Sequence, residues 1–179
     1  MDDKIYLIRL NYDFAIADIV ESMNNADSLE LTSETPDKLK NFKFNWLTNE
    51  SEIIPDSVII ISELIGGNSK FTSIIKAVSR NLHANHIKIG NETYDVFSNI
   101  TTYEKRLNLR RSKITRFSNG DIMDIKVPIL LPGEYNPIFK LEEMPSTYFC
   151  TSQFKDVYEK ERLTGFVFEE CKVKSKSWF

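Results

Sequence analysis

The pattern of apolar and polar positions along the chain predicts a succession of strands and helices. Residues 4–10 are rich in β-branched and aromatic residues, which predicts a first strand. In residues 16–23 the apolar residues fall at the i, i+3, i+4 and i+7 spacing of one helix face, which predicts a first helix. The residues with this spacing are Ile16, Ile19, Val20 and Met23.

The middle of the chain predicts a loop, a buried strand and a second helix. The polar stretch 27–52 predicts a loop that ends in a short strand, where aromatic residues occupy alternate positions. The apolar run 58–61 predicts a strand in the centre of a sheet, covered on both faces. The Gly-Gly-Asn of residues 66–68 predicts a turn and an N-cap, and the helical spacing of apolar residues over 71–82 predicts the helix that follows.

Turn residues mark the elements of the second half. Strands are predicted near 87–89 and 94–97. Asn119-Gly120 lies between two segments rich in strand formers, 113–117 and 122–127, which predicts a tight hairpin. The proline-rich stretch 128–145 predicts a loop.

The last elements complete a mixed α and β pattern. A strand at 148–150 leads into a helix that begins at Thr151-Ser152 and ends at Gly165, and a strand at 166–168 follows. Together the elements predict an α+β fold with a mixed or antiparallel sheet and about three helices. Because 179 residues is the length of one ordinary domain, we expect a single compact domain over residues 1–179.

Composition restricts the location of the protein. Hydrophobic residues make up 41 % and charged residues 27 % of the chain, as in ordinary globular proteins. No apolar run approaches the roughly 18 residues needed to cross a bilayer, and the first residues lack the apolar segment of a signal peptide. Two cysteines are too few for a disulfide framework. We therefore expect a cytoplasmic protein that does not bind membranes.

Three features are compatible with chemistry, but each favours a structural role. His83 and His86 lie near the predicted end of a helix, without further ligands at a metal-binding spacing. The Gly-Gly-Asn-Ser-Lys of residues 66–70 lacks the frame of a phosphate-binding loop. Cys150 lies in an apolar strand, which favours a buried and inert thiol. We expect no catalytic residue, no metal and no cofactor.

The strongest charge feature is the segment 105–116, in which six of twelve residues are basic and none is acidic. The basic residues are Lys105, Arg106, Arg110, Arg111, Lys113 and Arg116. Such segregation is typical of nucleic-acid contacts, so a nucleic-acid or regulatory binding module is the alternative function. The net charge of −3 and the absence of a nucleic-acid motif favour instead a charge patch that makes contacts within the molecule or with a partner protein.

Several motifs of the second half resemble a known family. They are Leu-Asn-Leu-Arg-Arg-Ser at 107–112, Pro-Ile-Phe-Lys-Leu at 137–141, Ser-Gln-Phe-Lys at 152–155 and Leu-Thr-Gly-Phe-Val-Phe at 163–168. In these motifs the chain resembles the immunity proteins of bacterial polymorphic toxin systems, in the superfamily that groups immunity families eleven and forty-three. The last two motifs are the most specific.

The resemblance is uneven along the chain. It is strongest over residues 91–171 and weaker over 1–90, and it leaves 172–179 as a basic, aromatic tail. The family often has acidic residues where this chain has Asn108, Arg110 and Arg111, which predicts a different partner surface.

Membership would imply a small cytosolic antitoxin, made together with a contact-dependent or type VI secretion toxin used in bacterial competition. Such a protein is not an enzyme, and it neutralises its cognate toxin by binding, typically by occluding the active site. Acidic and aromatic side chains outside the core are then the expected anchors for a basic toxin. These partner-binding candidates are Tyr135, Glu142, Glu143, Trp178 and Phe179. The oligomeric state is left open.

Overall fold

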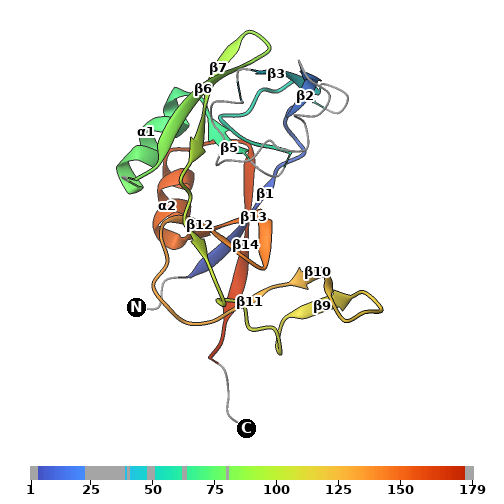
Figure 1. Ribbon diagram of the computed structural model, residues 1–179. Coiled ribbons are helices and arrows are strands. Elements are labelled where there is room, and N and C mark those ends of the chain that lie inside the picture. The colour runs from blue at the N-terminus through green and yellow to red at the C-terminus, as the bar shows by residue number, and fades with distance from the viewer. Residues whose placement is uncertain are drawn as a thin grey trace. The chain divides into compact units, whose positions relative to one another are not determined.

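The computed structural model of the chain describes residues 4–22, 39, 41–47, 51–61, 64–79 and 81–175 (Figure 1). Its contacts divide the chain into two compact units. Unit 1 consists of Met1–Ile8, Thr101–Lys155 and Phe168–Phe179, and unit 2 of Arg9–Ile100 and Asp156–Val167. The chain passes from one unit to the other within β1 (Ile5–Leu10), α2 (Ser152–Lys160) and β14 (Phe166–Val173), and between Ile100 and Thr101.

Six strands form a mixed sheet in unit 2. In hydrogen-bonded order they are β2 (Ile16–Ser22), β3 (Phe42–Leu47), β6 (His83–Ile89), β7 (Glu92–Ser98), β5 (Leu64–Gly67) and β4 (Ser57–Ile60). β3 and β6 run parallel, and the other neighbouring pairs run antiparallel. β2 also contacts β4, so the sheet curls until its first and last strands meet.

The curled sheet of unit 2 encloses a hydrophobic core. Its buried members are Ala17, Leu39, Phe42, Phe44, Val58, Ile60, Leu64, Ile87, Ile89, Tyr94 and Val96. The outer face of the sheet is covered by α1 (Ser69–Val78), which contacts β5 and β7 (Figure 1). The predicted N-cap of this helix is confirmed, because the Asn68 side-chain oxygen accepts hydrogen bonds from the backbone N–H groups of Lys70 and Phe71.

Gly66 and Gly67 lie in strand β5, and their prediction as a turn is wrong. A Cβ on Gly66 would lie 2.3 Å from the backbone oxygen of Asp95. A Cβ on Gly67 would lie 2.5 Å from both the Asp56 oxygen and the Phe71 Cβ. Both positions therefore need glycine because β7 and α1 approach the strand closely.

The helix predicted for residues 16–23 is wrong, because this segment forms strand β2. The apolar residues also satisfy a period of two: Ala15 and Ala17 are buried, and Ile19 packs against the same core. Val20 faces the opposite way and is 55 % exposed. Antiparallel pairing with β3 selects the strand, which β-branched residues favour, and Met23 lies outside the described residues.

β4 is a strand as predicted, and it is buried on both faces, but it lies at the end of the sheet order rather than in the centre. Residues 156–167 protect its free edge. The backbone N–H of Ser57 donates to the Thr164 oxygen at 3.0 Å. The hydrophobic run therefore indicated burial correctly, and this covering segment supplies that burial together with β2, which contacts β4 where the sheet curls.

A second six-stranded sheet belongs to unit 1. Its order is β11 (Ile129–Leu130), β14, β1, β13 (Met144–Thr151), β12 (Ile138–Leu141) and β8 (Thr102–Tyr103). β13 pairs antiparallel with β1 and β12, whereas β11 with β14 and β12 with β8 run parallel. β11 and β12 lie in the proline-rich stretch predicted as a loop, and pairing with distant segments makes these short apolar runs strands.

The predicted hairpin around Asn119-Gly120 is confirmed. It consists of β9 (Lys113–Arg116) and β10 (Ile122–Val127), which form a separate two-stranded sheet (Figure 1). Ile114, Ile122 and Ile125 pack one side of it on the core of unit 1. The buried members of that core are Ile5, Leu7, Leu107, Ile125, Leu130, Phe139, Leu141, Phe149 and Cys171.

The described residues contain two helices, α1 and α2, where about three were predicted. The missing one is the segment that forms β2. The α+β class is thus confirmed; the two six-stranded sheets are mixed, and the two-stranded sheet of the hairpin is antiparallel. Neither helix in the described part of the chain has the length and apolar character needed to cross a membrane.

A buried hydrogen-bond chain fastens residues 156–167 to β4 in unit 2. The Phe166 N–H donates to the Tyr158 hydroxyl at 3.0 Å, and that hydroxyl lies 2.7 Å from Ser57 Oγ. The Ser57 hydroxyl in turn donates to the Thr164 backbone oxygen at 2.8 Å. Because Tyr158 is only 2 % exposed, each of these groups depends on its protein partner.

Replacing Tyr158 with phenylalanine is expected to lower the free energy of unfolding by about 1–3 kcal/mol. The aromatic ring remains, but the Phe166 N–H and the Ser57 hydroxyl lose a buried partner. Urea titration measures the change. The exposed Tyr12, replaced in the same way, should change stability by no more than about 0.5 kcal/mol.

Tyr158→Phe should also change how the free energy of unfolding falls at alkaline pH. Burial raises the pKa of Tyr158 from its ordinary value near 10 to about 12, because the neutral phenol is favoured inside the protein. This contribution to stability is complete below pH 10 and is lost between pH 10 and 12, as the unfolded chain releases the proton first. The fall in stability over this range should be smaller in Tyr158→Phe; an unchanged fall would contradict the assignment.

Candidate functional site

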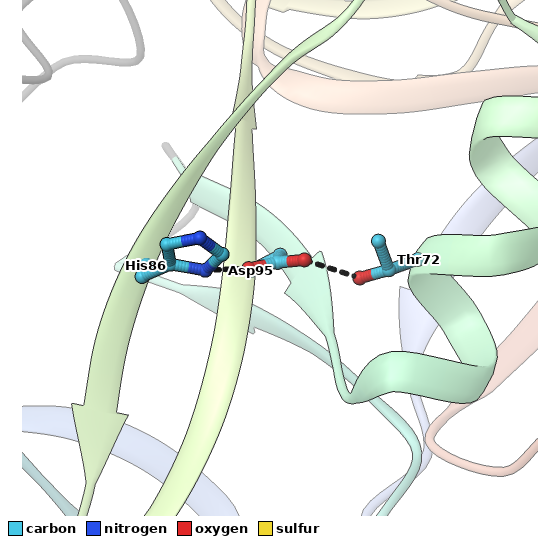
Figure 2. Close-up of polar contacts among 3 residues, drawn as sticks. All are labelled: Thr72, His86 and Asp95. Atoms are coloured by element: carbon cyan, nitrogen blue, oxygen red, sulfur yellow. Dashed lines mark hydrogen bonds and ion pairs between the residues drawn. The ribbon is translucent and has the colours of Figure 1, made fainter.

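A polar network joins three elements of unit 2 (Figure 2). His86 on β6 and Asp95 on β7 are paired residues of an antiparallel ladder, so their side chains share one face of the sheet. α1 covers this face and places Thr72 on the other side of the carboxylate. The His86 Nδ1–H donates to Asp95 Oδ1, and the Thr72 hydroxyl donates to Asp95 Oδ2 at 2.9 Å.

The position of Asp95 limits the chemistry of this network. In a nucleophilic triad the imidazole accepts the proton of the hydroxyl, and the carboxylate orients the imidazole. Here the Thr72 hydroxyl donates to the carboxylate instead and is buried, so the arrangement does not activate it. The network ties α1 to the sheet and orients the His86 side chain, which is 78 % exposed.

His86 also lines a groove of about 910 Å³ in unit 2. The groove is bounded by β2 and β3 on one side and by β6 and the following turn on the other. Its described lining residues are Val20, Leu39, Phe42, Lys43, Phe44, Asn45, Ala84, Asn85, His86, Ile87, Lys88, Gly90 and Asn91. The volume falls within the range of about 300–1,000 Å³ that ligand sites occupy.

The histidines and cysteines contribute no metal site in the described residues. His83 and His86 lie on strand β6, and their placement near a helix end is wrong because α1 already ends at Val78. Among the residues that the structure describes, no three or more His, Cys, Asp or Glu side chains are grouped to hold a metal ion. Cys150 is fully buried on β13, as predicted, and Cys171 is buried as well.

Three of the five predicted partner anchors lie close together in unit 1, where the Tyr103 ring contacts that of Tyr135 and the Tyr103 backbone oxygen accepts a hydrogen bond from the Glu142 N–H. Tyr135 is half-buried in unit 1, where its ring stacks on Phe139 with centroids 4.7 Å apart and its hydroxyl donates to the Leu131 oxygen. Burial also raises the pKa of this phenol. Glu142 is exposed in the turn between β12 and β13, and Glu143 is partly buried beside it. Trp178 and Phe179 lie outside the described residues.

The basic segment 105–116 is not a continuous stripe of cations. The Arg106 guanidinium lies over the rings of Tyr103 and Tyr135, at 5.8 and 5.6 Å from their centroids, and donates to the Pro132 oxygen. Arg116 donates to the Gly120 oxygen at 2.8 Å within the hairpin. The other basic side chains of the segment are exposed, namely Lys105, Arg110, Arg111 and Lys113.

Exposed apolar side chains accompany these cations on and next to the hairpin. Leu109, Phe117, Met123 and Val127 are 41, 53, 59 and 47 % exposed. We call these four residues, together with Lys113 and Arg116, the hairpin surface. Aromatic, methionine and arginine residues are enriched at protein–protein interfaces, and clustered exposed apolar residues mark interaction sites.

The sequence contained a signal for the hairpin surface that was missed. The predicted hairpin carries more large apolar residues than one face can bury, since Ile114, Ile122 and Ile125 already fill the core-facing side. Phe117 and Met123 had therefore to face solvent. The His86–Asp95 contact has no comparable signal, because it depends on the register of two strands.

No protein-family model matches the chain, and no curated protein matches its sequence.

Proposed function

We propose that the chain is an immunity protein that binds and neutralises a cognate bacterial toxin. The observation that carries the proposal is the hairpin surface, where large apolar side chains and cations are exposed together. A neutralising protein needs such anchors on a stable framework, and a standard interface buries about 1,600 Å² in total. The family resemblance of the sequence supports the same function.

The resembling motifs supply buried residues of the framework, and the hairpin surface supplies exposed residues for contact with the toxin. Phe139, Phe154, Leu163 and Phe166, which belong to the resembling motifs, are buried. Apart from Leu109, which belongs to the first motif, the residues of the hairpin surface lie between the first two motifs in the sequence, and all of them are exposed. A shared framework with a variable contact surface suits proteins that must each recognise a different toxin.

The charge of the hairpin surface indicates what the toxin presents. The exposed cations of the hairpin, Lys113, Arg116 and Lys126, outnumber its exposed carboxylates, Asp121 and Asp124, which favours an acidic patch on the partner. Phe117 and Met123 favour an apolar pocket at the centre of that patch. The acidic and aromatic anchors predicted from the sequence suit a basic patch on the partner, whereas the exposed cations of the hairpin suit an acidic patch. The hairpin surface is therefore a second candidate contact beside those anchors.

Replacing Phe117 or Met123 with aspartate is expected to weaken toxin binding by roughly 30-fold or more, the effect of losing an interface hot spot of about 2 kcal/mol. The toxin to test is the product encoded beside this chain, which the proposal predicts to kill cells unless the chain is co-expressed. Survival and calorimetric titration of the purified pair are the measurements. Tyr12→Asp, at a 63 % exposed residue of unit 2, is the matched control.

The outcomes separate the candidate functions. Protection that persists in both hairpin variants would contradict the hairpin surface as the contact. Failure of the unaltered chain to protect, with no stoichiometric complex, would contradict the immunity function. Nucleic acid that the chain retains at low salt and releases at moderate salt would favour the alternative function of the basic segment.

A further inference from the structure

Among the described residues, strands β3 and β6 of the unit 2 sheet are paired at one position only. β7 pairs with all seven residues of β6, from His83 to Ile89. On the opposite edge, the described residues pair β3 with β6 only at Phe44 and Ile89. In an antiparallel pair, alternate residues direct their backbone N–H and C=O groups away from the partner. Along most of β6 these groups therefore face the groove rather than a described strand.

Two kinds of side chain line this groove. Leu39, Phe42, Phe44 and Ile87 are buried members of the core and form an apolar floor. The next residues along the same strands lie on the other side of the sheet and form a rim that includes His86 and Lys88. None of the described lining residues is acidic. Within the part of the chain that the structure describes, a largely unpaired strand edge, an apolar floor and a basic rim thus occur together.

We propose that this groove binds an extended segment of a partner protein, which adds as a strand to the open edge of β6. Main-chain hydrogen bonds to β6 would supply affinity, as in other cases of strand addition. Because side chains of a strand alternate between its faces, the segment must be apolar at every second position, toward the floor. The positions between them meet His86 and Lys88, so acidic residues fit there.

The hydrogen bonds that orient His86 support a role for this residue in binding the added strand. Asp95, which accepts a hydrogen bond from Thr72, holds one edge of the imidazole, and Figure 2 shows the other ring nitrogen turned away from the carboxylate. A side chain that is 78 % exposed and yet oriented is suited to meet a ligand at the rim. Lys88 on the rim also disfavours a second copy of the same edge, since lysine on strand edges opposes self-pairing.

The inference goes beyond the proposed function. The groove belongs to unit 2, whereas the hairpin surface belongs to unit 1. Strand addition requires only a segment with the right pattern, and the partner need not be a toxin. Toxin binding at the hairpin surface therefore neither supports nor contradicts strand addition at β6, and the same holds if no toxin binds.

Two fluorescent peptides test the proposal on the full chain: one alternates glutamate with valine, and the other alternates lysine with valine. The glutamate peptide should bind at least 10-fold more tightly, as measured by fluorescence anisotropy. Binding should slow hydrogen exchange at the backbone amides of residues 84–88. Lys88→Glu should weaken binding of the glutamate peptide about 10-fold, and Lys172→Glu, at an exposed residue of unit 1, should leave it unchanged.

Three results would overturn the proposal. The first is equal binding of both peptides, or binding of neither. The second is peptide binding that slows hydrogen exchange at backbone amides outside β6 and not at those of β6. The third is a concentration-dependent dimer in which the β6 amides are already protected, because a second copy would then occupy the groove. Lys88 is exposed, so its replacement should leave the fold intact, which circular dichroism checks.

Discussion

Replacing Phe71 with alanine is expected to lower the free energy of unfolding by about 3–5 kcal/mol. Phe71 is fully buried on α1 and has aromatic neighbours from three other segments of unit 2. Its ring centroid lies 6.1 Å from that of Phe97, 6.4 Å from Tyr158 and 5.8 Å from Phe166. Truncation leaves a cavity at the point where α1, β7 and residues 156–167 meet. Since whole domains are stable by about 5–15 kcal/mol, this is a large fraction of the total.

Urea titration of Phe71→Ala, followed by circular dichroism, measures this loss. The matched control is Lys76→Ala, at an exposed position on the same helix, which should change stability by no more than about 0.5 kcal/mol. A loss below about 1.5 kcal/mol in Phe71→Ala would mean that the surrounding rings collapse into the space, and that the aromatic cluster does not hold α1 in place.

Replacing Gly165 with alanine is expected to cost about 3 kcal/mol or more, for two separate reasons. The residue has φ of 110°, which side-chain-bearing residues rarely adopt and which costs about 1–3 kcal/mol. In addition, a Cβ there would lie 2.1 Å from the backbone oxygen of Ser57 and 2.9 Å from the Pro55 Cβ. Forcing an atom into this contact costs a further 1–3 kcal/mol or so.

Gly120 separates these two contributions. It also has a positive φ, of 93°, but no atom lies within 4 Å of the position its Cβ would take. Gly120→Ala should therefore show only the backbone cost, about 1–2 kcal/mol. The difference between the two variants in thermal or urea unfolding measures the close approach of Gly165 to β4. Equal losses would show that residues 55–57 move aside without cost.

Local chemistry accounts for the elements that sequence patterns predicted correctly. Asn119-Gly120 suits a tight hairpin whatever surrounds it, and Asn68 caps α1 with bonds to residues two and three positions later. Such signals act over a few residues, so they can be read without knowing the fold.

The wrong predictions depend on contacts between distant segments. Residues 16–23 satisfied both a helical and an alternating pattern, and only pairing with β3 selects the strand. The apolar run at β4 indicated burial but not its source, which is a hydrogen-bonded segment more than a hundred positions later. The short strands β11 and β12 likewise depend on partners that the local sequence does not specify.

The same division applies to the candidate sites. The sequence by itself determined the charge of the basic segment, the position of the hairpin and the excess of apolar residues that one hairpin face cannot bury. Only the tertiary structure decided that Arg106 lies over two tyrosine rings, that His86 meets Asp95, and that in the described part of the chain β6 pairs with β3 at a single position. The physical reason is that side-chain periodicity is encoded locally, whereas strand register and sheet order arise from the packing of the whole chain.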